Sequence, residues 1–392
     1  MKLSVWVAMA GVGLAGSLAW HETPHQEPPP GAPPQITLVA TGDIMMHADV
    51  KQAAAQQGFP ALWADLVPLW KGADLAFANL ETPVAPVTGR PGKPYQFNAP
   101  AELPGELKAA GLQVLSTANN HAFDQGPRGV TETLQRLREA GLVPIGTGAT
   151  EAEAEQTVYL ERNGLKLAFL GFSDIFNNDL DGNPAKPWVR KLDLGAACEA
   201  VAQARKQADA VIVSIHWGIE DHHEPTPRQQ EAAARLVAAG ADVILGHHPH
   251  VLQPAAWVYA GGRKGFAAYS MGNFISNQNR VYRATDKPVM GDERDGLLVR
   301  IVLRKAAGGV AFVSAKGLPL WCENNWRDRK GGRVIRTLPV TEALKAPSAD
   351  TAMLELRAAR IRDIVGPVVA LIPPRAAAPG SPSGPSPAGS RP

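Results

Sequence analysis

The sequence contains few cysteines and almost no net charge, and both shortages limit what the protein can be. Cys198 and Cys322 are the two cysteines among 392 residues. They are too few for a disulfide framework or a thiolate metal site, which leaves at most one disulfide. The 39 basic and 37 acidic side chains give a formal net charge of +2, so we expect no nucleic-acid partner. Apolar residues make up 45% of the chain, which is enough for a folded core.

The two ends of the chain lack the composition of a folded domain. An uncharged apolar run follows Lys2 and closes on small residues that suit a signal peptidase. We predict that 1–20 is a signal peptide or an uncleaved N-terminal anchor. The protein would then be exported, periplasmic or extracellular, with the anchor holding it at the outer face of the cytoplasmic membrane. The proline-rich segment 21–35 is predicted to be a linker, and the Pro/Ala/Gly/Ser-rich segment 373–392 a disordered tail.

Between these ends, short β-branched runs alternate with amphipathic helices. The helices expected at 127–140 and 227–239 each carry one apolar stripe. Such alternation indicates βαβ units and a largely parallel sheet, with strands expected at 36–40, 74–79, 113–118, 143–146, 165–172, 210–215 and 241–245. Later strands with few helices predict a second, more antiparallel sheet packed on the first, formed by 251–259, 264–270, 296–305, 310–318 and 332–339. We expect one globular domain over 36–345 and a C-terminal helix within 346–372.

Histidines follow the predicted strands closely. The sequence has ten, none after residue 250, and those at 47, 121, 216 and 247–250 come directly after a predicted strand. Open α/β sheets bind their ligands at these strand ends. Carboxylate and amide side chains occupy the same positions, and a mixture of imidazole, carboxylate and amide oxygen suits Mn²⁺, Fe or Zn²⁺. The segments offer too many ligands for one tetrahedral ion, so we predict two divalent ions bridged by one carboxylate, a site suited to hydrolysing phosphate esters.

Several motifs carry a resemblance to a known family. They read TGDIMMH, FANLETP, STANNHAFDQGPRGVTET, HWGIE, ADVILGHHPHVLQP and AYSMGNFISN, and they cover about 36–280. In these motifs the chain resembles the CapA family of poly-γ-glutamate capsule biosynthesis proteins, whose fold is similar to that of the calcineurin-like metallophosphoesterases. The resemblance implies a four-layer α/β/β/α fold in which two packed mixed sheets are flanked by helices.

The metallophosphoesterase pattern implies a role for each matching residue. Glu81 stands where the bridging carboxylate would be, and His121 resembles the histidine that protonates a leaving oxygen. Glu220 is a second candidate for that proton transfer. The chain departs from the pattern at two points, because His47 follows Asp43 by four residues instead of two and because the bridging aspartate is replaced by Glu81. The implied metal ligands are Asp43, Glu81, Asn120, His216, His248 and His250, and the residues expected to support them or contact substrate are His47, Asn79, Asp124 and Asn273.

Some of these residues also have purely structural explanations. Asp43 could cap the helix that follows its strand, and Asp124 could cap a helix that opens at Pro127. Glu81 could be a solvated turn residue. Asn120 could occupy a left-handed turn, which asparagine tolerates.

The motif His248-Pro249-His250 is the sharpest metal signal in the sequence. The proline stiffens the loop and keeps both imidazoles aimed the same way. Adjacent side chains diverge, so His247 is expected to point away from the metals, as a partner or surface residue. The two histidines at 222–223 lie beyond the strand end beside acidic residues, and we expect them on a solvated rim.

Two functions of different classes fit the sequence. The first is a hydrolase with two metal ions that acts on a phosphoester or a γ-glutamyl polymer. The second is a non-catalytic assembly or transport component of a system that exports an anionic polymer. The expected partners are an anionic polymer or phosphoester substrate and a membrane-bound polymer-synthesis complex.

Overall fold

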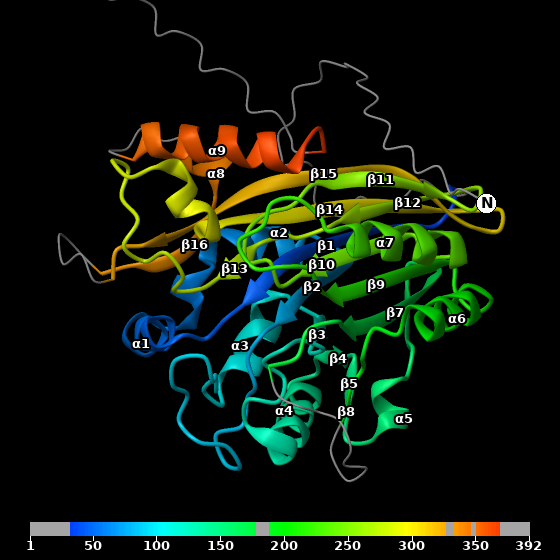
Figure 1. Ribbon diagram of the computed structural model, residues 1–392, viewed down its shortest axis with the longest axis horizontal. Helices are drawn as coiled ribbons and strands as arrows, with labels where there is room; N and C mark the ends of the chain where they lie inside the picture. Colours follow the sequence, from blue (N-terminus) through cyan, green and yellow to red (C-terminus); the bar gives the residue numbers. More distant parts are fainter. Residues whose placement is uncertain (1–31, 178–187, 327–332, 346–349, 369–392) are drawn as a thin grey trace, which may run out of the picture.

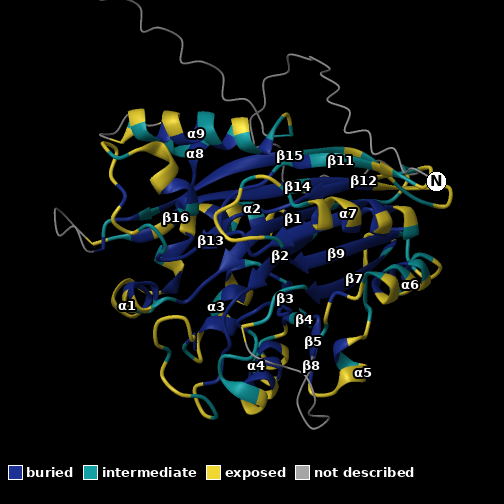
Figure 2. Ribbon diagram, in the orientation of Figure 1, coloured by how far each residue is buried: buried dark blue, intermediate teal, exposed yellow. Residues whose placement is uncertain are grey.

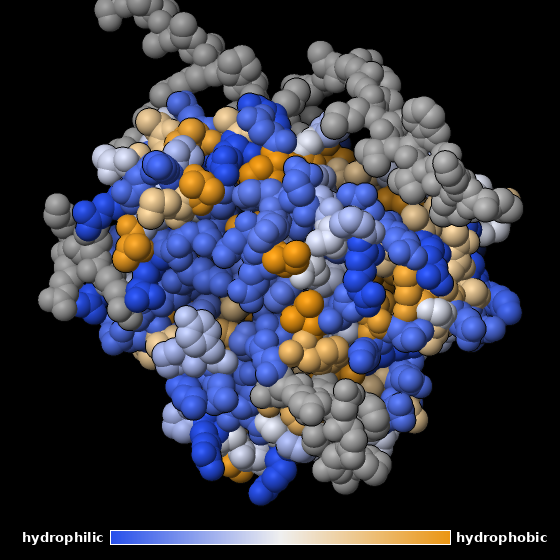
Figure 3. Space-filling model, in the orientation of Figure 1, coloured by the Kyte–Doolittle hydropathy of each residue, from blue (hydrophilic) through white to orange (hydrophobic). Residues whose placement is uncertain are grey.

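Two sheets stacked face to face form the centre of the protein, and helices cover their outer faces (Figure 1). The computed structural model describes residues 32–177, 188–326, 333–345 and 350–368. The predicted signal segment or anchor, most of the predicted linker and the predicted tail lie outside the described residues. Within the described ranges, every helix is too short or too polar to cross a bilayer. The face shown in Figure 3 is mainly hydrophilic, with hydrophobic residues scattered in small groups.

The first sheet combines early parallel strands with a late antiparallel extension. Its order is β16-β15-β14-β1-β2-β3-β4, and β13 pairs with the end of β1. Strands β1 to β4 run parallel, whereas β14 pairs antiparallel with β1 and the sheet continues through β15 and β16. The strands are β1 (Gln35–Ile44), β2 (Leu75–Leu80), β3 (Val114–Ser116), β4 (Val143–Ile145), β13 (Asn273–Ile275), β14 (Asp295–Ala306), β15 (Gly309–Asn324) and β16 (Ile335–Pro339).

The second sheet is built from the middle of the chain. Its order is β11-β12-β10-β9-β7-β6, in which β7, β9, β10 and β12 are parallel and both edge strands are antiparallel to their neighbours. The strands are β6 (Val158–Arg162), β7 (Leu165–Ser173), β9 (Ala210–His216), β10 (Val243–His247), β11 (Ala255–Ala260) and β12 (Arg263–Ala268). Outside both sheets, β5 (Thr147–Gly148) pairs with β8 (Trp188–Val189).

The prediction that the late strands form a sheet of their own is wrong. The β11–β12 hairpin joins the second sheet, and β14 to β16 extend the first. In β14, Leu297 and Val299 face the second sheet while Leu298 faces the outer helices. Such a pattern predicts a strand buried on both faces, but it does not say which strand is the neighbour.

Strand alternation separates an inner core, between the sheets, from the cores under the helices. Inner-facing residues such as Leu75 of β2 and Ile212 of β9 pack against each other. Helices α1 to α3 cover the outer face of the first sheet, and α6 and α7 cover that of the second. Figure 2 shows buried strands and exposed outer helix surfaces, so the predicted four-layer fold is confirmed. The covering elements are α1 (Ala48–Gln57), η1 (Phe59–Leu62), η2 (Ala64–Leu66), α2 (Val67–Lys71), α3 (Leu103–Ala110), α6 (Leu194–Arg205) and α7 (Pro227–Ala239).

Both amphipathic helices expected between the strands are present, as α4 (Gly126–Glu139) and α7. At the start of α7 the Thr226 side chain accepts the Gln229 backbone N–H while the Gln229 side chain reaches back to Thr226, an arrangement that satisfies free N–H groups at the helix start. Gly240 ends the helix with a φ of 130°, which glycine adopts without a steric penalty. The remaining helices are α5 (Glu151–Ala154), η3 (Pro288–Arg294), α8 (Val340–Ala343) and α9 (Thr351–Val365).

Helix α9 is fastened to the domain by buried charges as well as by apolar packing. The Arg357 guanidinium is fully buried and donates to Asp295 (Nε to Oδ1, 2.9 Å) and to Asp292 (Nη2 to Oδ1, 2.8 Å). Asp292 also binds Arg360, from the next turn of α9, and His223, whose Nε2 lies 2.8 Å from Oδ2. We call these five residues the α9 ion cluster. His222 is exposed, as predicted, whereas the His223 side chain is only 24% exposed and pairs with Asp292, so the predicted solvated rim holds for His222 alone.

Candidate metal centre

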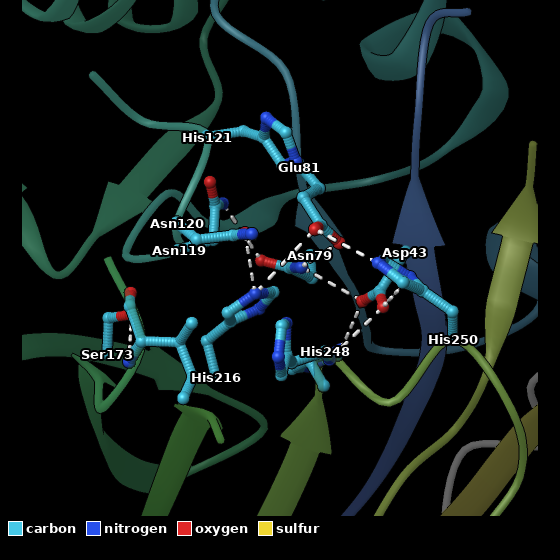
Figure 4. A network of polar contacts seen from close by, with 12 residues as sticks. Asp43, Asn79, Glu81, Asn119, Asn120, His121, Ser173, His216, His248 and His250 are labelled. Atoms are coloured by element: carbon cyan, nitrogen blue, oxygen red, sulfur yellow. Dashed lines mark hydrogen bonds and ion pairs between the residues drawn. The ribbon is translucent and has the colours of Figure 1, made fainter. Parts of the chain in front are cut away.

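Polar side chains gather where parallel strands of both sheets end (Figure 4). In β10, Val243 and Leu245 face the inner core, and His247 is the next inward position. In β9 the same alternation leads from Ile212 to His216. The two-residue period that packs the core therefore delivers imidazoles to its edge, where the carboxyl ends of the strands meet.

The turn after β10 brings two more histidines into the site. His248 (φ 98°) and His250 (φ 58°) both have a left-handed backbone, one on each side of Pro249. Such conformations cost roughly 1–3 kcal/mol and persist where the surrounding structure enforces them, commonly at functional sites. The His248 ring centroid lies 4.8 Å from that of His216 and 5.8 Å from that of His250. Three imidazoles thus lie beside one another.

Asp43, Glu81 and His250 form one buried group of ligand atoms. His250 Nδ1 lies 3.6 Å from Asp43 Oδ2, and His250 Nε2 lies 3.7 Å from Glu81 Oε1. Each side chain is at most 2% exposed, and one ligand atom from each lies within 4.8 Å of the others. Asn273 Oδ1 accepts from His250 Nδ1 at 3.2 Å and orients that ring. Oxygen and nitrogen donors at this spacing are able to hold a divalent ion.

Glu81, His216 and His248 form a second group, which shares Glu81 with the first. His216 Nε2 lies 3.6 Å from Glu81 Oε1 and 2.9 Å from Asn120 Oδ1. The amide oxygen of Asn120 therefore faces the same space as the imidazole. Together the two groups assemble the residues that the sequence proposes as metal ligands: Asp43, Glu81, Asn120, His216, His248 and His250.

Several nitrogen and oxygen atoms of the site are buried without a hydrogen-bond partner among the described residues. They include Glu81 Oε1, which both groups share, and Nδ1 of His216 and of His248. A buried carboxylate oxygen without a partner raises the free energy of the fold, and a bound cation would relieve this. Sulfur takes no part, because Cys198 and Cys322 are free and belong to neither group, and the allowed disulfide does not form. The oxygen and nitrogen donors fit Mn²⁺, Fe or Zn²⁺.

Burial sets the charge state of the site. Burial and the neighbouring Asp43 carboxylate raise the pKa of Glu81 well above its usual range. Burial also works to raise the pKa of Asp43, but hydrogen bonds from two histidines outweigh it and hold that pKa well below its usual range. Burial, aided by His250, lowers the pKa of His248 to about 3, and burial with the neighbouring His248 lowers that of His216 as well. Neutral imidazoles are the form that binds metal ions.

Asparagines and a histidine orient the two carboxylates. Asn79 Nδ2 donates to Asp43 Oδ1 at 2.9 Å and lies 3.5 Å from Glu81 Oε2. Asn119 Nδ2 in turn donates to Asn79 Oδ1 at 3.3 Å. His247 is 1% exposed, and its Nδ1 bonds Asp43 Oδ1 at 2.8 Å. The surface position considered for His247 is wrong, and the alternation of β10 is the signal that places it inward.

His121 is held at the edge of the site by Asp124 and Phe97. Its Nδ1 bonds Asp124 Oδ2 at 2.8 Å, and the same oxygen accepts the Phe97 backbone N–H at 2.5 Å. The Phe97 ring centroid lies 4.4 Å from that of His121 and 4.8 Å from that of His47. Asp124 thus orients His121 and does not cap α4, whose N-cap is Gln125. Nothing in the sequence marks Phe97, which lies in a loop between motifs.

The structural explanations considered for the other site residues are also wrong. Asp43 belongs to β1 and caps no helix, since His47 is the N-cap of α1. Glu81 is fully buried and therefore is no solvated turn residue. Asn120 does not have a left-handed backbone, and its Nδ2 donates to Asn177 Oδ1 at 3.1 Å.

Glu220 approaches the same ligands from the solvent side. Glu220 is exposed, whereas the residues of the two ligand groups are buried. One of its carboxylate oxygens nevertheless lies within 4.8 Å of ligand atoms of His248 and His250. The carboxylate therefore borders the open side of the centre. Its proposed part in proton transfer stays a prediction.

Comparison with known proteins confirms the resemblance carried by the motifs. Residues 37–278 match the family model described as "Bacterial capsule synthesis protein PGA_cap". The "Capsule biosynthesis protein CapA" of Bacillus anthracis is 34% identical over 252 residues, which are 62% of this chain and 60% of that protein. The "PGA biosynthesis protein CapA" of Bacillus subtilis (strain 168) is 33% identical over 271 residues, 68% of each chain. The solved calcineurin-like phosphoesterase YfkN from Bacillus subtilis gives a TM-score of 0.43 at 14% identity, covering 84% of this chain and 97% of that one.

Proposed function

The chain belongs to the bacterial capsule synthesis protein family PGA_cap, and from this premise we propose that it is a hydrolase that uses two divalent metal ions. The observation that carries the proposal is Glu81, whose buried and unpartnered Oε1 is shared by two groups of ligand atoms. A carboxylate between two ions about 3.5–4 Å apart is typical of two-metal hydrolases. The proposed substrate is a phosphoester or the γ-glutamyl amide of an anionic polymer.

Each ion would have its own ligands and share one carboxylate. When bound, the ions supply Lewis acidity and an activated water. Asn79 and His247 hold Asp43 by hydrogen bonds, so the chain fixes the orientation of this ligand before an ion arrives. Asp43 and His250 would hold the first ion, Asn120, His216 and His248 would hold the second, and Glu81 would serve both.

His121 is the proposed general acid. Because Asp124 occupies its Nδ1, Nε2 remains for the leaving group of a substrate. A positioned acid of this kind typically contributes about 10²–10⁴-fold to the rate.

The test compares His121→Ala with His248→Ala in the Mn²⁺-loaded chain. We expect His121→Ala to lower the turnover number on bis-p-nitrophenyl phosphate or a γ-glutamyl polymer by about 10²–10⁴-fold, with metal content unchanged. His248→Ala should lose metal, since its imidazole donates directly to an ion. Elemental analysis and steady-state kinetics measure both effects. The control is His222→Ala, which removes an exposed imidazole outside both ligand groups and should change neither.

Two results would redirect the proposal. Equal metal loss in both variants makes His121 a ligand, and the acid must then be sought at Glu220 or Asp124. A parent chain that takes up metal yet hydrolyses neither substrate contradicts the hydrolase. That result supports the second candidate, a non-catalytic assembly or transport component, which the word "synthesis" in the family description favours.

We further propose that the protein works outside the cytoplasm. The uncharged run after Lys2 supports export, with or without anchoring at the outer face of the cytoplasmic membrane. A capsule polymer made at the membrane would then reach the site, beside a membrane-bound polymer-synthesis complex. Fractionation of cells that express the full chain tests the location, and recovery in the cytoplasm would contradict it.

A further inference from the structure

An exposed carboxylate borders a site that is otherwise buried. The ligands His248 and His250 are 5% and 2% exposed, whereas Glu220 is exposed, with an oxygen within 4.8 Å of their ligand atoms. A substrate must approach the centre from the side that solvent reaches. Glu220 therefore lies next to the path of the reacting group.

Backbone contacts fix Glu220 in this place. The Asp221 N–H donates to the carbonyl oxygen of Pro249 at 2.9 Å, and Pro249 lies between the two histidine ligands. Gly218, with φ 90°, turns the loop so closely over Gln229 that a Cβ would lie 2.9 Å from its amide. On the other side of Glu220, the Trp217 N–H donates to the carbonyl oxygen of His247 at 3.0 Å. The loop is thus held on both sides of Glu220, and the carboxylate starts from a defined position beside the imidazoles.

The charge of Glu220 changes what the centre attracts. Two divalent ions held by the carboxylates of Asp43 and Glu81 would keep an excess of about two positive charges and so attract anions. The negative charge of Glu220 weakens this attraction at the solvent-facing side of the centre. Its carboxylate acts at short range, since an oxygen lies within 4.8 Å of ligand atoms of His248 and His250. An anion over the imidazoles meets repulsion that grows with its own charge.

We propose that Glu220 is a specificity-determining residue that disfavours dianionic phosphate monoesters and leaves the site to reacting groups with at most one negative charge. Phosphodiesters and carboxamides are the substrate classes that meet this condition. The proposal rests on the metal-dependent hydrolase proposed above. Repulsion of a competing substrate is a general route to specificity.

The test measures binding as well as turnover in Glu220→Gln, which removes the charge and keeps the shape. At pH 8 methyl phosphate is a dianion and dimethyl phosphate a monoanion. Titration calorimetry on the Mn²⁺-loaded full chain should show methyl phosphate binding about tenfold tighter to Glu220→Gln than to the parent, and dimethyl phosphate less than about twofold tighter. The turnover ratio of p-nitrophenyl phosphate to bis-p-nitrophenyl phosphate should rise in the same direction. The control, Glu224→Gln, removes an equal charge from the same exposed loop and should shift neither ratio.

The possible outcomes distinguish a failure of the Glu220 role from a failure of the metal-dependent hydrolase on which it rests. Equal changes for both anions, or metal loss from Glu220→Gln, overturn the specificity role and make Glu220 a ligand or a general field. An equal loss of turnover on both substrates makes it the proton donor and likewise overturns the role. A parent that takes up no metal overturns the hydrolase and this proposal together. Charge selectivity in a metal-loaded parent without hydrolysis overturns the hydrolase alone and supports the role of Glu220 in binding.

Discussion

The α9 ion cluster and the metal centre both bury charged side chains, and they differ in whether the protein alone provides every charge with a partner. In the α9 ion cluster, the Arg357 guanidinium donates to Asp292, Asp295 and the carbonyl oxygen of Pro288. In the metal centre, Glu81 Oε1 and three imidazole nitrogens, from His216, His247 and His248, have no partner among the described residues. One cluster is closed by its own side chains, and the other is left open for a ligand.

This difference separates two uses of burial. A closed cluster holds elements together, because removing one member strands a buried charge at a cost of roughly 3–5 kcal/mol. An open cluster weakens the fold until a ligand arrives, because its charges are desolvated without compensation. Removing a charge should therefore destabilise the protein at the first cluster and stabilise the metal-free protein at the second.

The largest expected effect comes from opening the closed cluster. Arg357→Ala leaves the carboxylates of Asp292 and Asp295 buried without their shared cation, and we expect the free energy of unfolding to fall by about 3–5 kcal/mol. Urea unfolding in the presence of a chelator measures it. The control on the same helix is Arg362→Ala, whose side chain is 39% exposed beside Asp363 and should change stability by less than about 0.5 kcal/mol. Equal effects of the two substitutions would show that the cluster contributes no more than a surface pair.

The next effect comes from removing the charge of the open cluster. Glu81 has a pKa raised in the folded protein, so the stability of the metal-free chain falls as pH rises above the unfolded pKa. At pH 7.5 with chelator, Glu81→Gln should therefore be more stable than the parent by about 1–2 kcal/mol. Mn²⁺ at 100 times its Kd should stabilise the parent by about 2.7 kcal/mol and the variant far less. Urea unfolding with chelator and with Mn²⁺ gives both numbers.

Glu132 on α4 is the matched control, because replacing it with glutamine should change stability in the opposite direction. It is also buried, but its carboxylate accepts hydrogen bonds from Val87, Thr88 and Arg136. Although burial opposes them, these bonds lower the pKa of Glu132 to about 2. Glu132→Gln should thus destabilise the chain by about 1–2 kcal/mol with or without Mn²⁺. If Glu81→Gln destabilises the metal-free protein in the same way, the idea of an open cluster is wrong.

The metal centre could be predicted further than the α9 ion cluster, and the reason is local geometry. His216 lies at the end of a strand whose alternation is visible in the sequence, and parallel strands bring their ends to one edge. His247 obeys the same alternation, so its inward direction could also have been predicted from Val243 and Leu245. The left-handed backbone of His248, however, follows from the packed turn and not from residue type.

The α9 ion cluster and the sheet order depend on long-range pairing that no local pattern carries. Arg357 and Asp292 are 65 positions apart in the sequence. An amphipathic helix with an arginine on its inner face has the same sequence pattern as an ordinary surface helix, so the pattern does not reveal the buried arginine. The β11–β12 hairpin could have paired with either sheet, since its apolar pattern fits both. Phe97 reaches His121 from a loop without periodicity.

The α9 ion cluster contains two groups whose charge depends on pH: His223, and Asp295, whose pKa burial raises to about 7 although Arg357 opposes this. His223 Nδ1 lies 2.7 Å from the carbonyl oxygen of Leu252, and its Nε2 lies 2.8 Å from Asp292 Oδ2. Both neighbours are acceptors, so only the imidazolium satisfies both ring nitrogens. Burial and the nearby Arg360 oppose this form, but the hydrogen bonds to Asp292 and Leu252 outweigh them and raise the pKa of His223.

The smallest effect should thus appear in the pH dependence of His223→Gln. A histidine whose folded pKa is raised stabilises the fold fully below its unfolded pKa of about 6.5, and this contribution is lost as pH rises through the folded pKa. His223→Gln should therefore lower the free energy of unfolding more at pH 5.5 than at pH 9. The loss relative to the parent should be about 1 kcal/mol larger at the lower pH, which corresponds to about 1–3 °C in Tm. Asp295 and the titrating groups outside the cluster are common to both chains, so their contributions cancel in the difference. His222→Gln, an exposed neighbour, should show no such difference. If the stability difference between the parent and His223→Gln is the same at both pH values, His223 carries no charge in the folded protein. The α9 ion cluster then consists of the arginines and aspartates alone.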